Sequence, residues 1–239
     1  MNENKSLFDS ELYEERFHDK ERRSNLRFIS ICLLVIWVLI ALAVGWHSSF
    51  GGVQVSGDSM NPGLKDKDFL LMRYFEEGDE LPYGSVIVLD IEHYPEVQAY
   101  NEQQRKKFPN WVDTKYIIKR LIAKEGDVVR CENGVLQVWY SGTDGFTTLN
   151  EPYAYYSDKA AYDFKEDYVV QEGEIFFLGD NRNISMDSRY KDGRSHLNGL
   201  YKETDICGIV PTWAIEHRKT LEPIFFWREL LSQKTAAFA

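Results

Sequence analysis

The feature that most constrains this chain is a long apolar run near its N-terminus. Residues 28–44 carry no charged side chain, and Gly45 and Trp46 extend the run. About 20 helical residues, each rising about 1.5 Å, cross the hydrocarbon core of a membrane. The run is apolar on every face, which favours a membrane span over the core helix of a soluble domain, and Trp46 suits an interfacial position. We therefore expect a transmembrane anchor at residues 27–46.

The distribution of basic residues predicts how this anchor is oriented. Four basic residues lie just before the span, and the next Lys or Arg after it is Lys65; the four are Lys20, Arg22, Arg23 and Arg27. Lys and Arg favour the cytoplasmic side. Residues 1–26 are therefore predicted to form a cytoplasmic tail, with residues 47–239 outside.

A cleaved signal peptide is the alternative interpretation of the apolar run, because Ala41-Leu42-Ala43 resembles a cleavage site. These alanines lie inside the apolar segment, where a soluble active site could hardly reach them. The sequence therefore favours an uncleaved anchor at the cell membrane.

Composition narrows the classes of partner and cofactor. The chain has 239 residues and a net charge of −10, which argues against a nucleic-acid-binding surface. Cys131 and Cys207 lie on the predicted outer side, where a disulfide is chemically allowed, but nothing local indicates that they pair. The favoured interpretation is that both cysteines are small apolar residues in strands. No Cys or His spacing is typical of a zinc site, and neither a metal nor a cofactor is expected.

The region after the span has the pattern of a mainly β domain. Short β-rich runs bounded by turn residues predict strands at 68–74, 85–91, 116–123, 127–130, 135–140, 174–178 and 206–210. Asn133-Gly134 predicts a hairpin turn. The polar stretch 93–114 interrupts the pattern, and residues 97–107 are predicted to be helical within it. The apolar tail 223–231 is too short to span, and either packs on the domain or lies on the membrane.

Two residues in apolar, strand-like surroundings carry the candidate chemistry. Ser59 follows a glycine turn, and Lys119 lies between Ile118 and Arg120 in a β-rich run. A serine hydroxyl needs a base, and lysine serves only when neutral, which at a pKa of about 10.4 holds for about one lysine in 2,500 at pH 7. In a strand Lys119 shares a face with Ile117 and Leu121, so a core-facing side chain would be desolvated and its pKa lowered.

Each residue alone has an ordinary structural explanation: a turn serine and a solvent-facing strand lysine. Together they suggest a Ser–Lys hydrolase, a variant of the serine triad. A third segment follows the apolar residues 176–178, namely Gly179-Asp180-Asn181-Arg182 and then Ser185, Asp187, Ser188 and Arg189. Alone, it reads as an Asx-rich loop.

The residues around Ser59 and Lys119 form two further segments. The first segment reads Gly57-Asp58-Ser59-Met60-Asn61-Pro62, and the second reads Tyr116-Ile117-Ile118-Lys119-Arg120 with Gly126-Asp127. In this order the three segments resemble those of type I signal peptidases, the membrane-bound Ser–Lys proteases of the S26 family, in the single-span form of Gram-positive bacteria. The first segment resembles the family pattern Gly-x-Ser-Met-x-Pro, and the second and third resemble its lysine segment and its Gly-Asp-Asn segment. The resemblance covers residues 26–215.

The resemblance implies a role for each matching position. Ser59 would be the nucleophile and Lys119 the general base, and Ser185 would hydrogen-bond the lysine and orient it. The remaining matches are structural: Asp187 and Arg189 as an ion pair near the site, and Met60 as a residue packed beside the nucleophile. Gly57 stands where some members have a serine that contributes to the oxyanion hole, so the backbone N–H of Ser59 remains a donor and the second donor is open.

The resemblance also implies a fold, a substrate and a location. The expected fold is an antiparallel β catalytic domain, with its site in a groove facing the membrane. The expected activity is removal of signal peptides from exported preproteins by cutting after small residues, in Ala-x-Ala sites. The expected partners are these signal peptides and membrane lipid, with an association with the secretion machinery left open. Residues 93–114 and 139–170 match no recognised motif.

Two other classes of protein remain as alternatives. A non-catalytic relative acting as an assembly chaperone could dispense with Ser59 or Lys119, and both are present. A self-cleaving repressor of the LexA type also uses Ser and Lys, but it would need a DNA-binding domain where this chain has its apolar run. A peptidase dedicated to one substrate, such as a pilus protein, would have the same sequence features as a general one.

Overall fold

The computed structural model describes residues 3–157, 166–191, 194–195, 201–220 and 236–238. The chain divides into two compact units, Met1–Ser49 and Phe50–Ala239. The apolar tail 223–231 lies outside the described residues.

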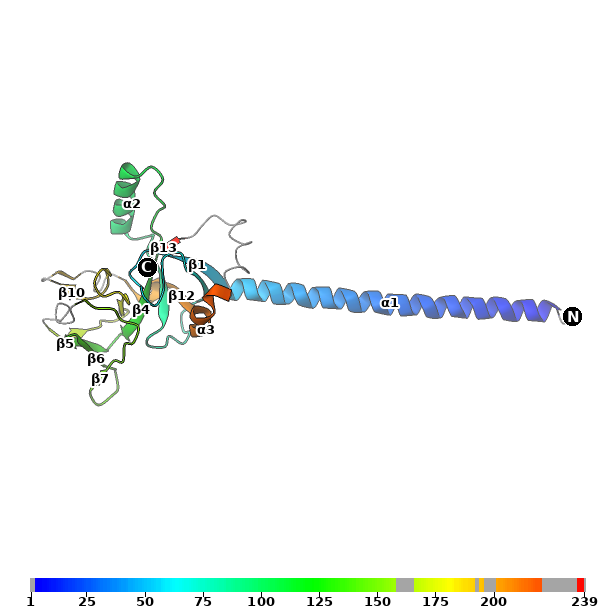
Figure 1. Cartoon of the computed structure of the whole chain (residues 1–239). Coiled ribbons are helices and arrows are strands. Elements are labelled where there is room, and N and C mark those ends of the chain that lie inside the picture. Colours follow the sequence, from blue (N-terminus) through cyan, green and yellow to red (C-terminus); the bar gives the residue numbers. More distant parts are fainter. Residues whose placement is uncertain (1–2, 158–165, 192–193, 196–200, 221–235, 239) are drawn as a thin grey trace. The chain divides into compact units, whose positions relative to one another are not determined.

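The first unit is one continuous helix, α1 (Glu3–Ser49), as Figure 1 shows. It includes the apolar run, and the large side chains from Phe28 to Val44 are exposed, as in a helix that contacts lipid. Among the described residues it is the one helix long and apolar enough to cross a membrane, over Arg22–Ser49.

The second unit is built on a seven-stranded sheet. Its strands stand in the order β13-β1-β2-β12-β3-β4-β9, and β13 also pairs with β4, so six of them close into a ring. The bounds are β1 (Phe50–Ser56), β2 (Phe69–Tyr74), β3 (Val86–Asp90), β4 (Tyr116–Lys124), β9 (Ile175–Leu178), β12 (Ile206–Val210) and β13 (Ala236–Phe238).

Most neighbouring strands in this sheet are antiparallel, as the sequence predicted, but β13 is parallel to both β1 and β4. Strands β1 and β13 were not predicted. Gly51-Gly52 has low strand propensity, so β1 depends on pairing with β2.

Two smaller sheets are found in the rest of the described residues. The first has the order β7-β6-β5-β8, and the second pairs β10 with β11. Asn133 and Gly134 connect β5 to β6 with positive φ angles of 52° and 68°, which confirms the predicted hairpin. The bounds are β5 (Val128–Glu132), β6 (Val135–Trp139), β7 (Phe146–Thr148), β8 (Tyr168–Val169), β10 (Tyr190–Lys191) and β11 (Arg194–Ser195).

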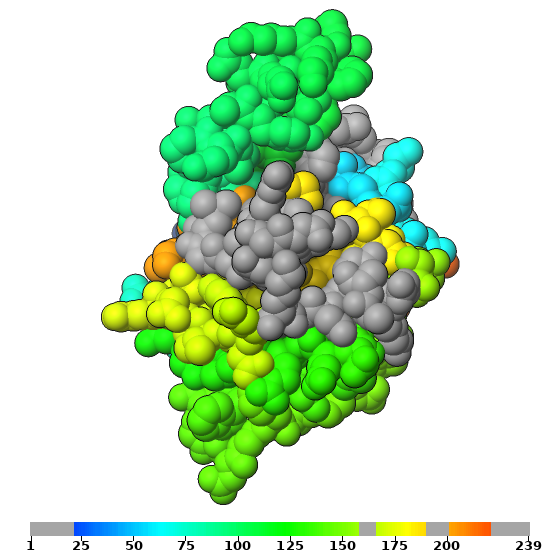
Figure 2. Space-filling view, turned by 90° about the vertical axis from the view of Figure 1, so that its left-hand side faces the viewer, coloured from blue at the N-terminus to red at the C-terminus, as the bar shows by residue number. Residues whose placement is uncertain are grey.

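Three short helical elements lie between strands in the part of the chain that the structure describes: α2 (Pro95–Lys107), η2 (Glu203–Asp205) and α3 (Thr212–Glu216). Helix α2 confirms the predicted helix in the polar insertion. Its Asn101 is buried and bonds both the N–H and the C=O of Thr114, which fastens the returning chain to the helix. In Figure 2 this insertion and the hairpins of β5–β7 occupy opposite ends of the face shown.

Strand β4 contributes to all three hydrophobic clusters of the second unit. Ile118 packs with residues of β1 and β2, Leu121 packs with residues of β3 and β9, and Ile122 packs with residues of β5 and β6. A register shift between Leu121 and Ala123 turns the strand from one cluster to the next. A side chain in the middle of β4 is therefore surrounded by core on several sides.

Cys131 and Cys207 do not form a disulfide with each other. Cys131 is buried in β5, and Cys207 is half-buried in β12, where its thiol donates to the carbonyl of Val88. Both are small strand residues, as the sequence favoured.

Candidate active site

The candidate nucleophile lies in a turn directly after β1. Gly57 has a φ of 97°, which favours glycine, and its N–H donates to Asp66. The turn then buries Ser59, whose relative exposure is 7%, and places the fully buried Met60 in the cluster beneath β1. The glycine reverses the chain so that the serine faces the domain.

The candidate base comes from the centre of β4. Lys119 Nζ lies 2.8 Å from Ser59 Oγ and 3.0 Å from the carbonyl oxygen of Ile118. The lysine is 3% exposed, although strand lysines usually face water. The fold therefore joins two residues that are 60 positions apart in the sequence.

Burial changes the acidity of this lysine. It lowers the pKa of Lys119 from 10.5 to about 8, while the carboxylates of Asp187 and Asp180 act in the opposite direction. At a pKa of about 8, roughly one molecule in ten holds the amine neutral at pH 7. Lys119 can thus accept a proton under ordinary conditions.

The loop after β9 covers the two residues. The N–H of Asn181 donates to the carbonyl oxygen of Ser59 at 2.9 Å. Gly179 leaves no room for a side chain, because a Cβ there would collide with Ser185 Oγ and lie 2.6 Å from the Ser59 carbonyl oxygen. The Gly179–Asp180 turn therefore approaches the nucleophile as closely as a backbone can.

Ser185 lies in this loop, but its geometry differs from the one that the resemblance implies. Its Oγ is a buried atom with no hydrogen-bond partner among the described residues, so it does not bond Lys119 here. The lysine instead bonds Ser59 and the Ile118 carbonyl. A buried hydroxyl left unpaired is unfavourable, by about 1–3 kcal/mol, so this orphan oxygen marks a place where a partner is expected.

Asp187 and Arg189 form the buried ion pair that their positions implied. Arg189 Nε donates to Asp187 Oδ1 at 2.7 Å, and Nη2 donates to Oδ2 at 3.1 Å. The same carboxylate accepts the N–H of Gly179, and the same guanidinium donates to the carbonyl oxygens of Arg182 and Ser185. The pair thus holds both ends of the loop that carries Ser185.

A second buried pair ties the loop to the strand of the lysine. Arg120, next to Lys119, donates through Nε and Nη2 to the two oxygens of Asp180, at 2.8 and 2.7 Å. Its Nη1 donates to the carbonyl of Gly84, and its guanidinium lies over the ring of Tyr153. Burial raises the pKa of Asp180, and the hydrogen bonds from Arg120 oppose that rise.

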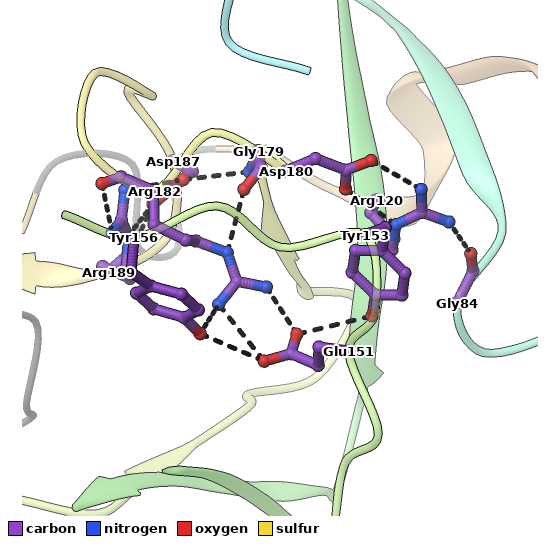
Figure 3. A network of polar contacts seen from close by, with 10 residues as sticks. All are labelled: Gly84, Arg120, Glu151, Tyr153, Tyr156, Gly179, Asp180, Arg182, Asp187 and Arg189. Atoms are coloured by element: carbon purple, nitrogen blue, oxygen red, sulfur yellow. Dashed lines mark hydrogen bonds and ion pairs between the residues drawn. The ribbon is translucent and has the colours of Figure 1, made fainter. Parts of the chain in front are cut away.

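A third pair was not anticipated from the sequence. Figure 3 shows the guanidinium of Arg182 pointing at the carboxylate of Glu151, with Tyr156 beside it. Arg182 also donates to the carbonyl oxygen of Gly179 at 2.9 Å. Glu151 and Tyr156 belong to residues 139–170, a segment without a recognised motif. The sequence carries no local signal for this pair, because an arginine requires a carboxylate partner only where the fold buries it.

Among the described residues, no group of three His, Cys, Asp or Glu side chains could hold a metal ion. Within the same residues the N–H of Ser59 makes no hydrogen bond, so this donor remains available to a ligand.

Comparison with known proteins identifies a family. Residues 27–214 match the family model described as "Signal peptidase, peptidase S26". Signal peptidase I P of Bacillus subtilis subsp. natto is 29% identical over 200 residues, which cover 80% of this chain and 91% of the relative. Signal peptidase I of Streptococcus pneumoniae serotype 4 is 25% identical over 206 residues, covering 73% of this chain and 87% of the relative.

Solved structures were also found similar, and one of them is a signal peptidase I. A crystal structure of a signal peptidase I from Enterococcus faecalis V583 aligns with 56% of this chain and 98% of its own, with 19% sequence identity and a TM-score of 0.34.

Proposed function

Because the chain belongs to the signal peptidase family S26, we propose that it is a membrane-anchored serine endopeptidase that removes N-terminal signal peptides from exported preproteins. The observation that carries this proposal is the 2.8 Å contact between Ser59 Oγ and the Nζ of a buried Lys119. A non-catalytic assembly chaperone would not need this contact.

In the first half of the reaction, the neutral amine of Lys119 takes the proton of the Ser59 hydroxyl. The Ser59 Oγ attacks the carbonyl carbon of the scissile peptide bond and forms a tetrahedral oxyanion. The ammonium of Lys119 then gives its proton to the nitrogen of the leaving mature chain. The signal peptide remains as an ester on Ser59.

In the second half, Lys119 is again neutral and takes a proton from water. The resulting hydroxide attacks the ester carbonyl, and the proton returns to Ser59 Oγ as the acyl–oxygen bond breaks. The free N–H of Ser59 is one donor for the oxyanion of both halves. Gly57 brings no side-chain hydroxyl, so a second donor must come from another group.

Ser185 is proposed as a positioning residue for Lys119. Its orphan Oγ belongs to the loop that covers the dyad. When Lys119 becomes an ammonium, it has three protons to donate. The Ser185 hydroxyl is an unused acceptor in the loop that covers Ser59 and Lys119. Ser185→Ala is expected to lower kcat less than Ser59→Ala or Lys119→Arg, because the proton acceptor is still present.

The proposed substrates carry small residues at the first and third positions before the cut, as in Ala-x-Ala. An extended peptide pairs its backbone with strand edges, and shallow pockets then select small side chains. The proposed location is the cell membrane, with α1 as a single span, residues 1–26 in the cytoplasm and residues 47–239 outside. Signal peptides and lipid are then its partners.

The test is cleavage of a preprotein with an Ala-x-Ala site by the full chain in detergent, with N-terminal sequencing of the product. We expect cleavage after the second alanine, and loss of cleavage by at least about a thousandfold in Ser59→Ala. The matched control is Ser141→Ala, which removes a hydroxyl from an exposed serine and should retain full activity. Near-full activity of Ser59→Ala would remove Ser59 from the mechanism.

A further inference from the structure

Strand β1 has one edge that β2 does not use. The N–H and C=O of Val55 bond the chain next to β2, through Asp68 at 2.9 Å and Lys67 at 2.8 Å. Backbone groups alternate sides along a strand, so those of Gln54 and Ser56 face the other way. This edge runs directly into the turn that carries Ser59.

Strand β4 has a corresponding edge. Leu121 donates its N–H to Ser85, and Lys115 accepts from Ile91, so alternate residues face the β3 side. The backbone groups of Tyr116 and Ile118 therefore face away from β3. Pairing with β9 begins only at Arg120, which leaves the edge before Lys119 for another strand.

Strand β13 fills both edges at once. Ala237 is level with Val55 on one side and Tyr116 on the other, and Phe238 is level with Ser56 and Ile117. Figure 1 draws β13 beside these two strands. A short segment near the C-terminal end of the sequence therefore lies between the strand that leads to the nucleophile and the strand that carries the base.

The direction of β13 matches that of a substrate. It is parallel to β1 and to β4, so it runs toward Ser59 and Lys119. Its last paired residue, Phe238, is level with Ser56 and Ile117, which precede Ser59 by three residues and Lys119 by two. The part of a substrate that precedes the cut must also run toward the nucleophile from its N-terminal side.

The sequence of the segment matches the proposed specificity as well. Residues 237–239 read Ala-Phe-Ala, with two alanines separated by one residue. This is the pattern proposed for the residues before the cut. The match concerns residue types, and it is independent of the strand pairing.

We propose that β13, residues 236–238, is an intramolecular inhibitor that reversibly occupies the substrate's strand position between β1 and β4. The inference rests on the proposed function and adds a regulatory segment to it. A substrate must displace the tail before it can pair with either strand. If the tail occupies the position in nine molecules of ten, the apparent KM is raised about tenfold and kcat is unchanged.

The test compares the full chain with a chain that ends at Thr235, on a peptide with an Ala-x-Ala site. We expect KM to fall at least about threefold on deletion, with kcat unchanged. A synthetic peptide of residues 233–239 should compete with substrate for the shortened chain and raise its KM again.

A full-length variant separates displacement from truncation. The N–H of Ala237 faces β1 by the same alternation, and Ala237→Pro removes it, which disfavours pairing within a sheet. This variant should reproduce the lower KM, whereas Ala237→Ser, which keeps the N–H, should behave as the full chain. An unchanged KM in the shortened chain overturns the proposal. A lower unfolding midpoint with lost kcat does so too, because β13 would then be a permanent strand.

A measurement without catalysis distinguishes this proposal from the proposed function. In Ser59→Ala protein, the amides of Ser56 and Ile118 should exchange with solvent faster after the deletion, at an unchanged unfolding midpoint, and the synthetic peptide should restore their protection. If no form cleaves the substrate, the proposed function fails, and this exchange still decides the role of the tail. Unchanged exchange overturns the tail proposal alone.

Discussion

At the scale of single residues, the chemistry depends on how completely Lys119 is removed from water. Its 3% exposure lowers the pKa, and two nearby carboxylates limit how far the pKa falls. Asp187 and Asp180 are each held by an arginine, Arg189 and Arg120 respectively, which reduces their pull on the ammonium. The two ion pairs therefore affect the base electrostatically as well as fixing the loop.

The first prediction concerns the pH dependence of cleavage. Since only the neutral amine accepts the serine proton, kcat/KM should rise with pH and level off above the Lys119 pKa of about 8. Lys119→Arg should be inactive at every pH tested, because arginine stays protonated. Lys107→Arg, an exposed exchange of the same kind on α2, is the control and should be fully active. A flat profile between pH 6 and 9 would assign the base to another group.

The second prediction concerns stability. Lys119 has a lower pKa when folded than when unfolded, so the folded chain binds fewer protons between about pH 8 and 10.5, and stability rises with pH through that range. Below pH 8 the unfavourable burial of the charge is fully present. Lys119→Met should therefore be more stable than the parent at pH 7, by on the order of 3 kcal/mol, and this difference should shrink toward pH 10.5.

The measurement is the free energy of unfolding from urea titrations of both proteins in the same detergent at pH 7 and pH 10. Equal differences at the two pH values would mean that Lys119 is not the source of the effect. The Lys119→Met variant is expected to be more stable but inactive, because it has no base.

At the scale of elements, β1, β4 and the loop after β9 converge on one point, and three arginine–carboxylate pairs hold the loop. The Arg182–Glu151 pair connects the loop to residues 151–156 (Figure 3). Its side chains are 2% and 8% exposed. In the surface pair Arg130–Asp167, the arginine likewise donates to both carboxylate oxygens, but the two side chains are 38% and 40% exposed.

The third prediction uses this contrast. Glu151→Gln should lower the free energy of unfolding by about 3 kcal/mol, because the buried charge of Arg182 loses its partner. It should also lower kcat, since Arg182 bonds the Gly179 carbonyl beside the nucleophile. The matched variant Asp167→Asn should change stability by less than about 1 kcal/mol. Comparable effects of both variants on urea unfolding would contradict the role given to Glu151.

At the scale of the whole molecule, the chain consists of an apolar helix and a β unit with its own hydrophobic core. The exposed apolar side chains of α1 favour lipid, and the second unit has its own hydrophobic clusters. The chain passes from α1 to β1 without an intervening residue, since α1 ends at Ser49 and β1 begins at Phe50. The nucleophile is thus only ten residues along the chain from the end of the helix.

The fourth prediction concerns topology. The basic residues precede the apolar run, so external protease added to cells with permeabilised walls should degrade residues 47–239 and spare an epitope attached before residue 1. A cytoplasmic marker protein that survives intact is the control for leakage. Protection of the large unit together with loss of the epitope would reverse the orientation.

Local patterns in the sequence were sufficient for much of the architecture. Helix α2 begins at Pro95, a residue suited to a first helical position, and ends with basic residues that suit a C-terminus, so it was found within two residues. The Asn133-Gly134 turn and the strands from β2 to β6 also follow from short-range signals. Strand β13 could not be found this way, because three residues carry no periodicity and their pairing is with distant strands.

The residue types and order of the motifs determined the family, the mainly β fold and the choice of Ser59 and Lys119, because reaction chemistry restricts which side chains can serve. Only the tertiary structure decided that Lys119 is buried, since burial depends on three clusters assembled from the whole unit. It likewise paired Arg182 with Glu151, left Ser185 Oγ without a partner, and placed β13 between β1 and β4. These facts depend on contacts between residues far apart in the chain, and no local pattern records them.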